Sequence, residues 1–158
     1  MGLRMECLVG AVAAILIAPV AAGAETPAQM AANKKVVLEF YRNVWEPQRL
    51  DAMKDYYDPD IVEHNPNVRS GIAGFAETMG RRWVAKPVEA SLKNPPAMVT
   101  ADGDTVTLVF KRPRPDPADP TRTYDTWWFD MFRLKNGKVV EHWDAATRPA
   151  AAPVASRP

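Results

Sequence analysis

The stretch WWFDMFRLKNGKVVEHWD, residues 127–144, contains two runs of strand-forming residues joined by Asn136 and Gly137. An Asn-Gly pair between β-rich segments is the strongest short-range signal for a β-hairpin. We therefore expect two antiparallel strands, residues 124–135 and 138–144, connected by a two-residue turn.

One face of this predicted hairpin carries polar groups among apolar ones. Side chains alternate between the two faces of a strand. In the first strand, Trp128, Asp130 and Phe132 share a face, and in the second strand Val140, His142 and Asp144 share a face. If the strands pair so that these two faces coincide, all six side chains lie on one side of the hairpin. Burying carboxylates and an imidazole is costly unless they are paired or used, so we interpret this face as the lining of a pocket. The alternative is an exposed pair of His142 and Asp144 at the sheet end.

The ends of the chain resemble processing and tail segments. Residues 1–24 combine Arg4, an apolar run over 7–22 and the small-residue triplet 22–24, which predicts a signal peptide cleaved before Glu25 and a periplasmic or secreted protein. A membrane anchor is the alternative, but the run is marginal for a core of ~30 Å. Cleavage would remove Cys7, the only cysteine. Residues 147–158 are rich in alanine and proline and predict a disordered tail, leaving one domain over 25–146.

Composition excludes several classes of function. The net charge is +1, and no Lys/Arg stripe with interleaved aromatics indicates nucleic acid as a partner. The sequence has neither a glycine-rich phosphate loop nor a Gly-x-Ser-x-Gly elbow, and we expect no cofactor. No metal is expected, because the histidines lack a ligand spacing, although a His/carboxylate site stays open. After cleavage, no apolar segment of membrane length remains.

Helical patterns come first and strand patterns later. Helices are predicted at 26–45, 49–57 and 72–83, with Phe75 facing inward in the last. Strands are predicted at 61–65, 89–92, 97–101, 105–112, 124–135 and 138–144. The proline-rich segment 112–121 is expected to be an exposed connection. Helices gathered before an antiparallel sheet indicate an α+β fold.

Two motifs resemble a known family. HNPNVRSGIAGF (64–75) and FDMFRLKNGKVVEHWD (129–144) resemble the SnoaL-like, polyketide cyclase-like branch of the nuclear transport factor 2-like superfamily, over residues 34–144. The resemblance implies a cone-shaped curved antiparallel sheet wrapped around N-terminal helices. It also implies an acid/base carboxylate on the closing strands, which matches Asp144 with His142 beside it.

Ketosteroid isomerase, in the same superfamily, is similar at three positions. They are a helix tyrosine, a residue before a proline and a hairpin carboxyl: Tyr41, Asn65 and Asp130. The general base of that enzyme is replaced here by the amide of Asn65, which disfavours its route. Tyr41 and Asp130 could still form an oxyanion-binding pair, although Tyr41 could equally be a core tyrosine. His64 and Asn65 point to opposite faces, and Asn65 is expected to point inward.

These expectations define a function and a site. We expect cofactor-free acid/base chemistry, of the aldol cyclisation or isomerisation type, on a small hydrophobic organic carbonyl compound. The predicted catalytic residues are Asp144 as the base, His142 assisting it, and protonated Asp130 with Tyr41 as donors. Asn65 would orient the carbonyl, and the predicted substrate-binding residues are Asn65, His64, Trp128, Phe132 and Phe75. A non-catalytic binding or accessory protein is the alternative. Epoxide hydrolase-like chemistry is disfavoured, because the inward face of the hairpin has no arginine.

The other face of the hairpin is also apolar. Trp127, Phe129, Met131 and Trp143 alternate with the predicted pocket residues. A strand that is apolar on both faces is covered on both sides. Because helices would cover the concave side, we expect a homodimer through the convex sheet face.

Overall fold

A computed structural model of the protein describes residues 26–149. The predicted signal peptide and residues 150–158 of the predicted tail lie outside this range. Within residues 26–149, no helix has both the length and the apolar character needed to cross a membrane.

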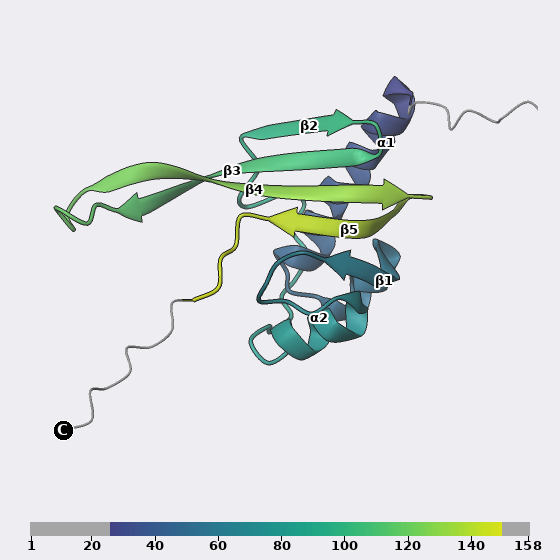
Figure 1. The fold of residues 1–158 in the computed structure, drawn as a ribbon, viewed down its shortest axis with the longest axis horizontal. Coiled ribbons are helices and arrows are strands. Elements are labelled where there is room, and N and C mark those ends of the chain that lie inside the picture. Colours follow the sequence, from purple (N-terminus) through teal and green to yellow (C-terminus); the bar gives the residue numbers. More distant parts are fainter. Residues whose placement is uncertain (1–25, 150–158) are drawn as a thin grey trace, which may run out of the picture.

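The elements follow the predicted order, with helices before most of the sheet, which confirms the α+β class (Figure 1). They are α1 (Pro27–Phe40), the π-helical turn η1 (Tyr41–Trp45), the 3₁₀-helix η2 (Leu50–Asp55), β1 (Tyr57–Glu63), α2 (Gly71–Met79), β2 (Met98–Asp102), β3 (Thr105–Pro115), β4 (Thr123–Lys135) and β5 (Lys138–Asp144). The second and third helices are shorter than predicted, and β1 begins four residues earlier than the predicted 61.

The start of α1 follows directly from its sequence. The Thr26 hydroxyl accepts the Gln29 N–H at 3.2 Å, and Pro27 occupies the first turn, where its missing N–H has no role. At the other end the helix widens, because the Glu46 N–H donates to the carbonyl of Tyr41, five residues earlier, at 2.9 Å. Such π turns are rare and are frequently found at functional sites.

The sheet has the order β1-β5-β4-β3-β2. Its pairs are antiparallel except β1 with β5, which is parallel and departs from the expected all-antiparallel sheet. At the hairpin turn, Asn136 and Gly137 have φ of 53° and 74°. Two successive positive φ angles are the type I′ geometry that matches strand twist. The predicted β4–β5 hairpin is therefore confirmed.

The register brings the two predicted polar faces together. Asp130 pairs with Asp144, and Phe132 pairs with His142. Val140 is the exception, because the register shifts between Arg133 and Leu134 and Val139 takes the buried position instead. This bulge adds one residue to β5, so alternation counted back from His142 fails beyond it.

One prediction in the middle of the chain was wrong, and the bounds of another were corrected. Residues 89–92 form no strand, and just after them the backbone N–H groups of Lys93 and Asn94 donate to the Glu46 carboxylate instead of to a sheet. The segment from 112 is not a simple loop, since β3 continues to Pro115 as the protruding hairpin of Figure 1. In the described part of the chain, no strand pairs with β3 beyond Val109 on its β2 side, so the prolines there remove no backbone hydrogen bond from that edge.

The core lies between the helices and one face of the sheet. α1 crosses this face against β2 and β3, and α2 lies beside β1 (Figure 1). Val37 and Phe40 of α1 pack with Val106 and Leu108 of β3, all at most 1% exposed. The opposite face keeps Trp127 and Phe129 half exposed. Within residues 26–149 the helices thus cover one face of the sheet, which is the face that carries Trp128, Asp130, Phe132, His142 and Asp144.

Candidate active site

A cavity of about 150 Å³ lies between the helices and the polar face of the hairpin. All the site residues predicted from the sequence line it except His64. The lining comprises Phe40, Tyr41, Trp45, Tyr57, Asn65, Phe75, Arg112, Trp128, Asp130, Phe132, His142 and Asp144.

Tyr41 reaches the cavity from the π turn at the end of α1. Its hydroxyl donates a hydrogen bond to Asp130 Oδ2. Burial, reinforced by the negative charge of Asp130, raises the pKa of Tyr41 well above its usual value. Tyr41 therefore stays a neutral donor, and its hydroxyl is committed to Asp130.

Asp130 is 5% exposed and accepts hydrogen bonds at both carboxyl oxygens. Besides Tyr41 at Oδ2, the indole Nε1–H of Trp128 donates to Oδ1 at 2.8 Å. Trp128 and Asp130 can meet because residues two apart lie on the same face of β4. This arrangement differs from the expected one, in which Asp130 donates, because here the carboxyl group receives two neutral donors.

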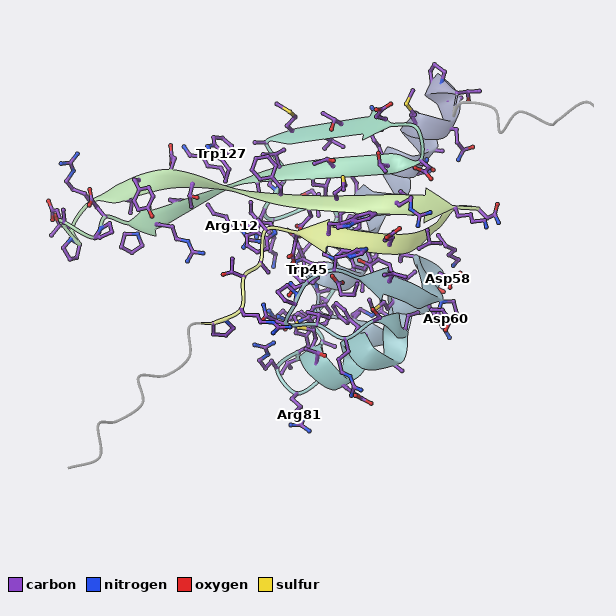
Figure 2. The ribbon with its side chains drawn as sticks, viewed as in Figure 1. Trp45, Asp58, Asp60, Arg81, Arg112 and Trp127 are labelled. Carbon is purple, nitrogen blue, oxygen red and sulfur yellow. The ribbon has the colours of Figure 1, made fainter. Side chains whose placement is uncertain are left out.

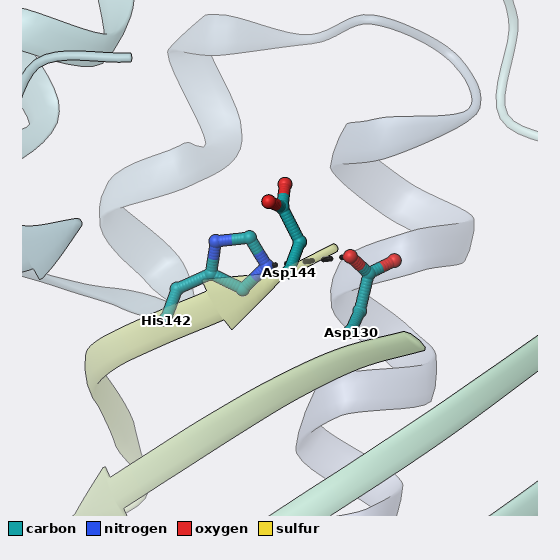
Figure 3. A group of neighbouring side chains, drawn as sticks. All are labelled: Asp130, His142 and Asp144. Atoms are coloured by element: carbon teal, nitrogen blue, oxygen red, sulfur yellow. Dashed lines mark ion pairs between the residues drawn. The ribbon is translucent and has the colours of Figure 1, made fainter. Parts of the chain in front are cut away.

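His142 lies between the carboxyl groups of Glu63 and Asp130. Figure 3 shows its ion pair with Asp130. Its Nδ1 is 2.9 Å from Glu63 Oε2, and its Nε2 is 3.5 Å from Asp130 Oδ1. Burial alone would lower the pKa of His142, but hydrogen bonds to Asp130 and Glu63 and their charges raise it from 6.5 to about 9. At neutral pH the ring is therefore a largely buried imidazolium, 12% exposed, with a proton on each nitrogen.

Glu63 is a site residue that sequence reasoning missed. Its side chain is 4% exposed, and it binds His142 as well as the backbone N–H of Asn65, at 2.8 Å. The sequence did contain a signal for Glu63, because Ile61, Glu63 and Asn65 are each two residues apart in the predicted strand and therefore share one face. Placing Asn65 inward also places Glu63 inward.

Asp144 is held by two donors at the end of β5. The Asn65 amide donates to Oδ2 at 2.6 Å, and the Ala146 N–H donates to Oδ1 at 2.9 Å. The side-chain oxygen Oδ1 of Asn65 accepts the Asn67 N–H at 2.9 Å, so it is also committed. Asn65 is thus placed to position Asp144, whereas the sequence suggested that it orients the substrate carbonyl.

His64 lies outside the cavity, which corrects its assignment to substrate binding. Its Nε2 is 2.7 Å from Glu141 Oε1, and its ring stacks on Trp143 with centroids 4.8 Å apart. Both partners lie on the outer face of β5. Neighbouring residues of an extended chain point to opposite sides, so His64 faces away when Asn65 faces in.

Arg112 is the second residue that sequence reasoning missed. It follows Leu108 and Phe110 on the inward face of β3, and its guanidinium carbon lies 4.3 Å from the ring centroid of Trp128. The predicted hairpin has no inward arginine, but the next strand supplies one. Among the described residues, Arg112 forms no ion pair with Asp130 or Asp144. It therefore does not bridge two acids.

Asp130, His142 and Asp144 could hold a metal ion in principle. One ligand atom from each lies within 4.8 Å of the others. A metal could bind His142 only after the ring lost a proton, and the pKa of about 9 means that the ring holds this proton at neutral pH. The Asp130 oxygens already accept from Tyr41 and Trp128. The donor set therefore fits a protonated network better than a metal centre, and the expected absence of a metal stays a prediction.

Solved structures share the fold. The putative hydroxylase AclR from Streptomyces galilaeus matches with a TM-score of 0.51 at 24% identity, covering 75% of this chain and 76% of that chain. An NTF2-like protein of unknown function from Burkholderia pseudomallei matches with a TM-score of 0.51 at 16% identity, covering 75% and 92%. A putative SnoaL-like polyketide cyclase from Jannaschia matches with a TM-score of 0.50 at 19% identity, covering 78% and 92%.

These identities establish a shared fold alone, because one fold supports many activities. No curated protein matches the sequence significantly. The profile of the SnoaL-like domain matches residues 37–142, which span α1 to β5 and include most of the cavity lining. The chain belongs to the SnoaL-like domain family.

Proposed function

We propose that the protein removes a proton from a carbon next to a carbonyl group of a small organic molecule, without a cofactor, as in aldol cyclisation or isomerisation. The observation that carries this proposal is the pairing of an oriented carboxylate, Asp144, with a buried imidazolium, His142, in one small cavity. A base that takes the α-proton and a donor that stabilises the developing oxyanion are the two groups that assist enolate formation.

Asp144 is the proposed base. Each of its oxygens accepts one hydrogen bond, from Asn65 and from the Ala146 N–H, so its orientation is set while lone pairs remain. In the proposed step, Asp144 takes the α-proton and the C–H electron pair becomes the enolate C=C bond. The carbonyl π electrons move to oxygen, which becomes negative.

His142 is the proposed stabiliser of that oxygen. The contact of its Nε2 with Asp130 Oδ1, at 3.5 Å, is longer than a typical hydrogen bond and therefore weak, so the Nε2–H can also donate to a substrate oxygen in the cavity. Glu63 keeps Nδ1 protonated and fixes the ring. This assigns His142 an electrostatic role, in place of assisting the base.

The test is exchange of α-protons for deuterium, followed by proton NMR in D₂O with acetophenone and 4-acetylbenzoate as probes. Wild-type protein should catalyse exchange into the acetyl group, and Asp144→Asn should lower the rate by about 10²–10⁴-fold. Asp60→Asn, an exposed carboxylate of β1, is the matched control and should keep the rate. Circular dichroism checks that the variants fold.

The opposite result is equally clear. Equal exchange by wild type and a folded Asp144→Asn variant would contradict the assignment. Binding of a probe with no catalysed exchange would favour the alternative function, a non-catalytic small-molecule-binding or accessory protein that uses the same cavity.

A further inference from the structure

The catalytic cavity adjoins a second and wider one. This outer cavity has a volume of about 660 Å³ and shares Tyr41, Trp45 and Arg112 with the inner cavity of about 150 Å³. The three shared residues form the boundary that we call the throat. A closed apolar cavity of ~150 Å³ holds roughly one benzene ring. A larger substrate would therefore place its reacting end inside and extend through the throat.

Cations dominate the outer cavity. Its lining includes Lys86, Lys93, Lys111 and Arg112 but a single acid, Glu46. Glu46 is occupied, because its oxygens accept backbone N–H groups of residues 93 and 94. Two of the cations are also paired, Lys93 with Glu89 at 3.0 Å and Lys111 with Asp125 at 2.9 Å.

Arg112 and Lys86 are the cations of this lining that form no ion pair with a described residue. Lys86 is exposed, whereas Arg112 is half-buried and lines both cavities. The Arg112 guanidinium is held against Trp128, yet its N–H donors form no hydrogen bond with any described side chain or backbone group. A guanidinium that is held in place while its N–H donors have no partner can bind a planar anion through two parallel hydrogen bonds.

The inner cavity has the opposite character. Beyond Arg112 at the throat, it collects the carboxyl groups of Asp130 and Asp144, with Glu63 behind His142, against one imidazolium. A substrate carboxylate would be disfavoured there and favoured at the throat, because like charges repel at short range. The charge distribution would therefore orient a substrate that carries both groups, with its carbonyl inward and its carboxylate outward.

We propose that the substrate is a carboxylate-bearing carbonyl compound whose carboxylate binds Arg112 at the throat while its carbonyl end lies beside Asp144 and His142. This deepens the proposed function and rests on it for the carbonyl end. Arg112 is then the residue that selects an acidic substrate over a neutral one.

The experiment compares binding of a matched pair of probes by calorimetry at low ionic strength. Acetophenone is neutral, and 4-acetylbenzoate carries a carboxylate across one aromatic ring from the same ketone. Wild-type protein should bind 4-acetylbenzoate at least about 10-fold more tightly, which corresponds to about 1.4 kcal/mol. Arg112→Gln should abolish the difference. Arg81→Gln, an exposed arginine distant from the throat (Figure 2), should preserve it.

Each other outcome overturns the proposal. Equal affinity of wild type for the two probes, or no detectable binding of either, removes carboxylate recognition. Equal weakening of both probes by Arg112→Gln indicates a structural role for the arginine. Inorganic phosphate competing as tightly as 4-acetylbenzoate indicates a general anion site.

Deuterium exchange separates this proposal from the proposed function. If 4-acetylbenzoate binds through Arg112 but its acetyl protons exchange no faster than with Asp144→Asn, the proton-transfer function fails and carboxylate recognition stands. If exchange is catalysed while the two probes bind equally, the function stands and the substrate class is wrong.

Discussion

The free energy of unfolding should fall as the pH rises from 6 to 9.5, because of one buried side chain. His142 is held between Glu63 and Asp130, and their hydrogen bonds and charges outweigh its burial and raise its pKa from 6.5 to about 9. In the unfolded chain these partners are lost and the imidazole returns to its ordinary pKa.

The sign and the size follow from linkage. Below pH 6.5 both states hold the proton, and the stabilisation is fully present. Between pH 6.5 and 9 the folded protein holds a proton that the unfolded chain has released, so stability declines with rising pH. A rise of the pKa from 6.5 to about 9 corresponds to roughly 3 kcal/mol, a large part of the stability of a small domain.

The assay is urea unfolding at several pH values, followed by tryptophan fluorescence, with an NMR titration of both histidines. Glu63→Gln keeps the size of the side chain but removes one charge, so the pKa of His142 should fall and the pH dependence should shrink. His64→Gln is the matched control, because His64 lies on the outer face, where it contacts Glu141 and Trp143.

A stability that stays constant between pH 6.5 and 9 would refute this reasoning. So would an NMR titration in which His142 has a pKa at or below 6.5. Either result would mean that the two carboxyl groups do not offset the cost of burying the charged ring.

Tyr41→Phe should lower the free energy of unfolding by about 1–3 kcal/mol, because buried Asp130 loses a donor, and a loss below about 0.5 kcal/mol would contradict this. We also propose a homodimer through the sheet face that carries exposed Trp127 and Phe129. Sedimentation should show a dimer that Phe129→Glu dissociates, and a wild-type monomer at micromolar concentration would exclude it. The proposed export predicts an N-terminus near Glu25 by mass spectrometry, whereas an uncleaved chain in the membrane fraction would indicate an anchor.

Features that depend on neighbouring residues could be predicted from the sequence. The Asn136-Gly137 turn, the cap at Thr26 and the alternation along β4 all follow from local backbone preferences, and each is present in the structure. Local patterns were weaker where a distant partner decides. The segment 89–92 has strand-like residues, but the chain after it is bound by the Glu46 carboxylate, which lies more than 40 residues earlier.

The catalytic candidates show the same division. Alternation was enough to group Asp130, His142 and Asp144, because a short hairpin sets its own register. It could not bring in Glu63, which reaches His142 because β1 pairs in parallel with β5 across 79 positions of sequence. Nor could it bring Arg112 over Trp128, which depends on the pairing of β3 with β4.

By itself, the sequence determined which residues alternate, where the chain turns and which polar side chains share a strand face, since these depend on the backbone geometry of a few adjacent residues. The tertiary structure alone decided the charge of His142, the orientation of Asp144 and the position of the Arg112 guanidinium, which pairs with no acid among residues 26–149. These properties depend on which groups approach within about 4 Å, and that is set by the packing of strands and helices far apart in the chain.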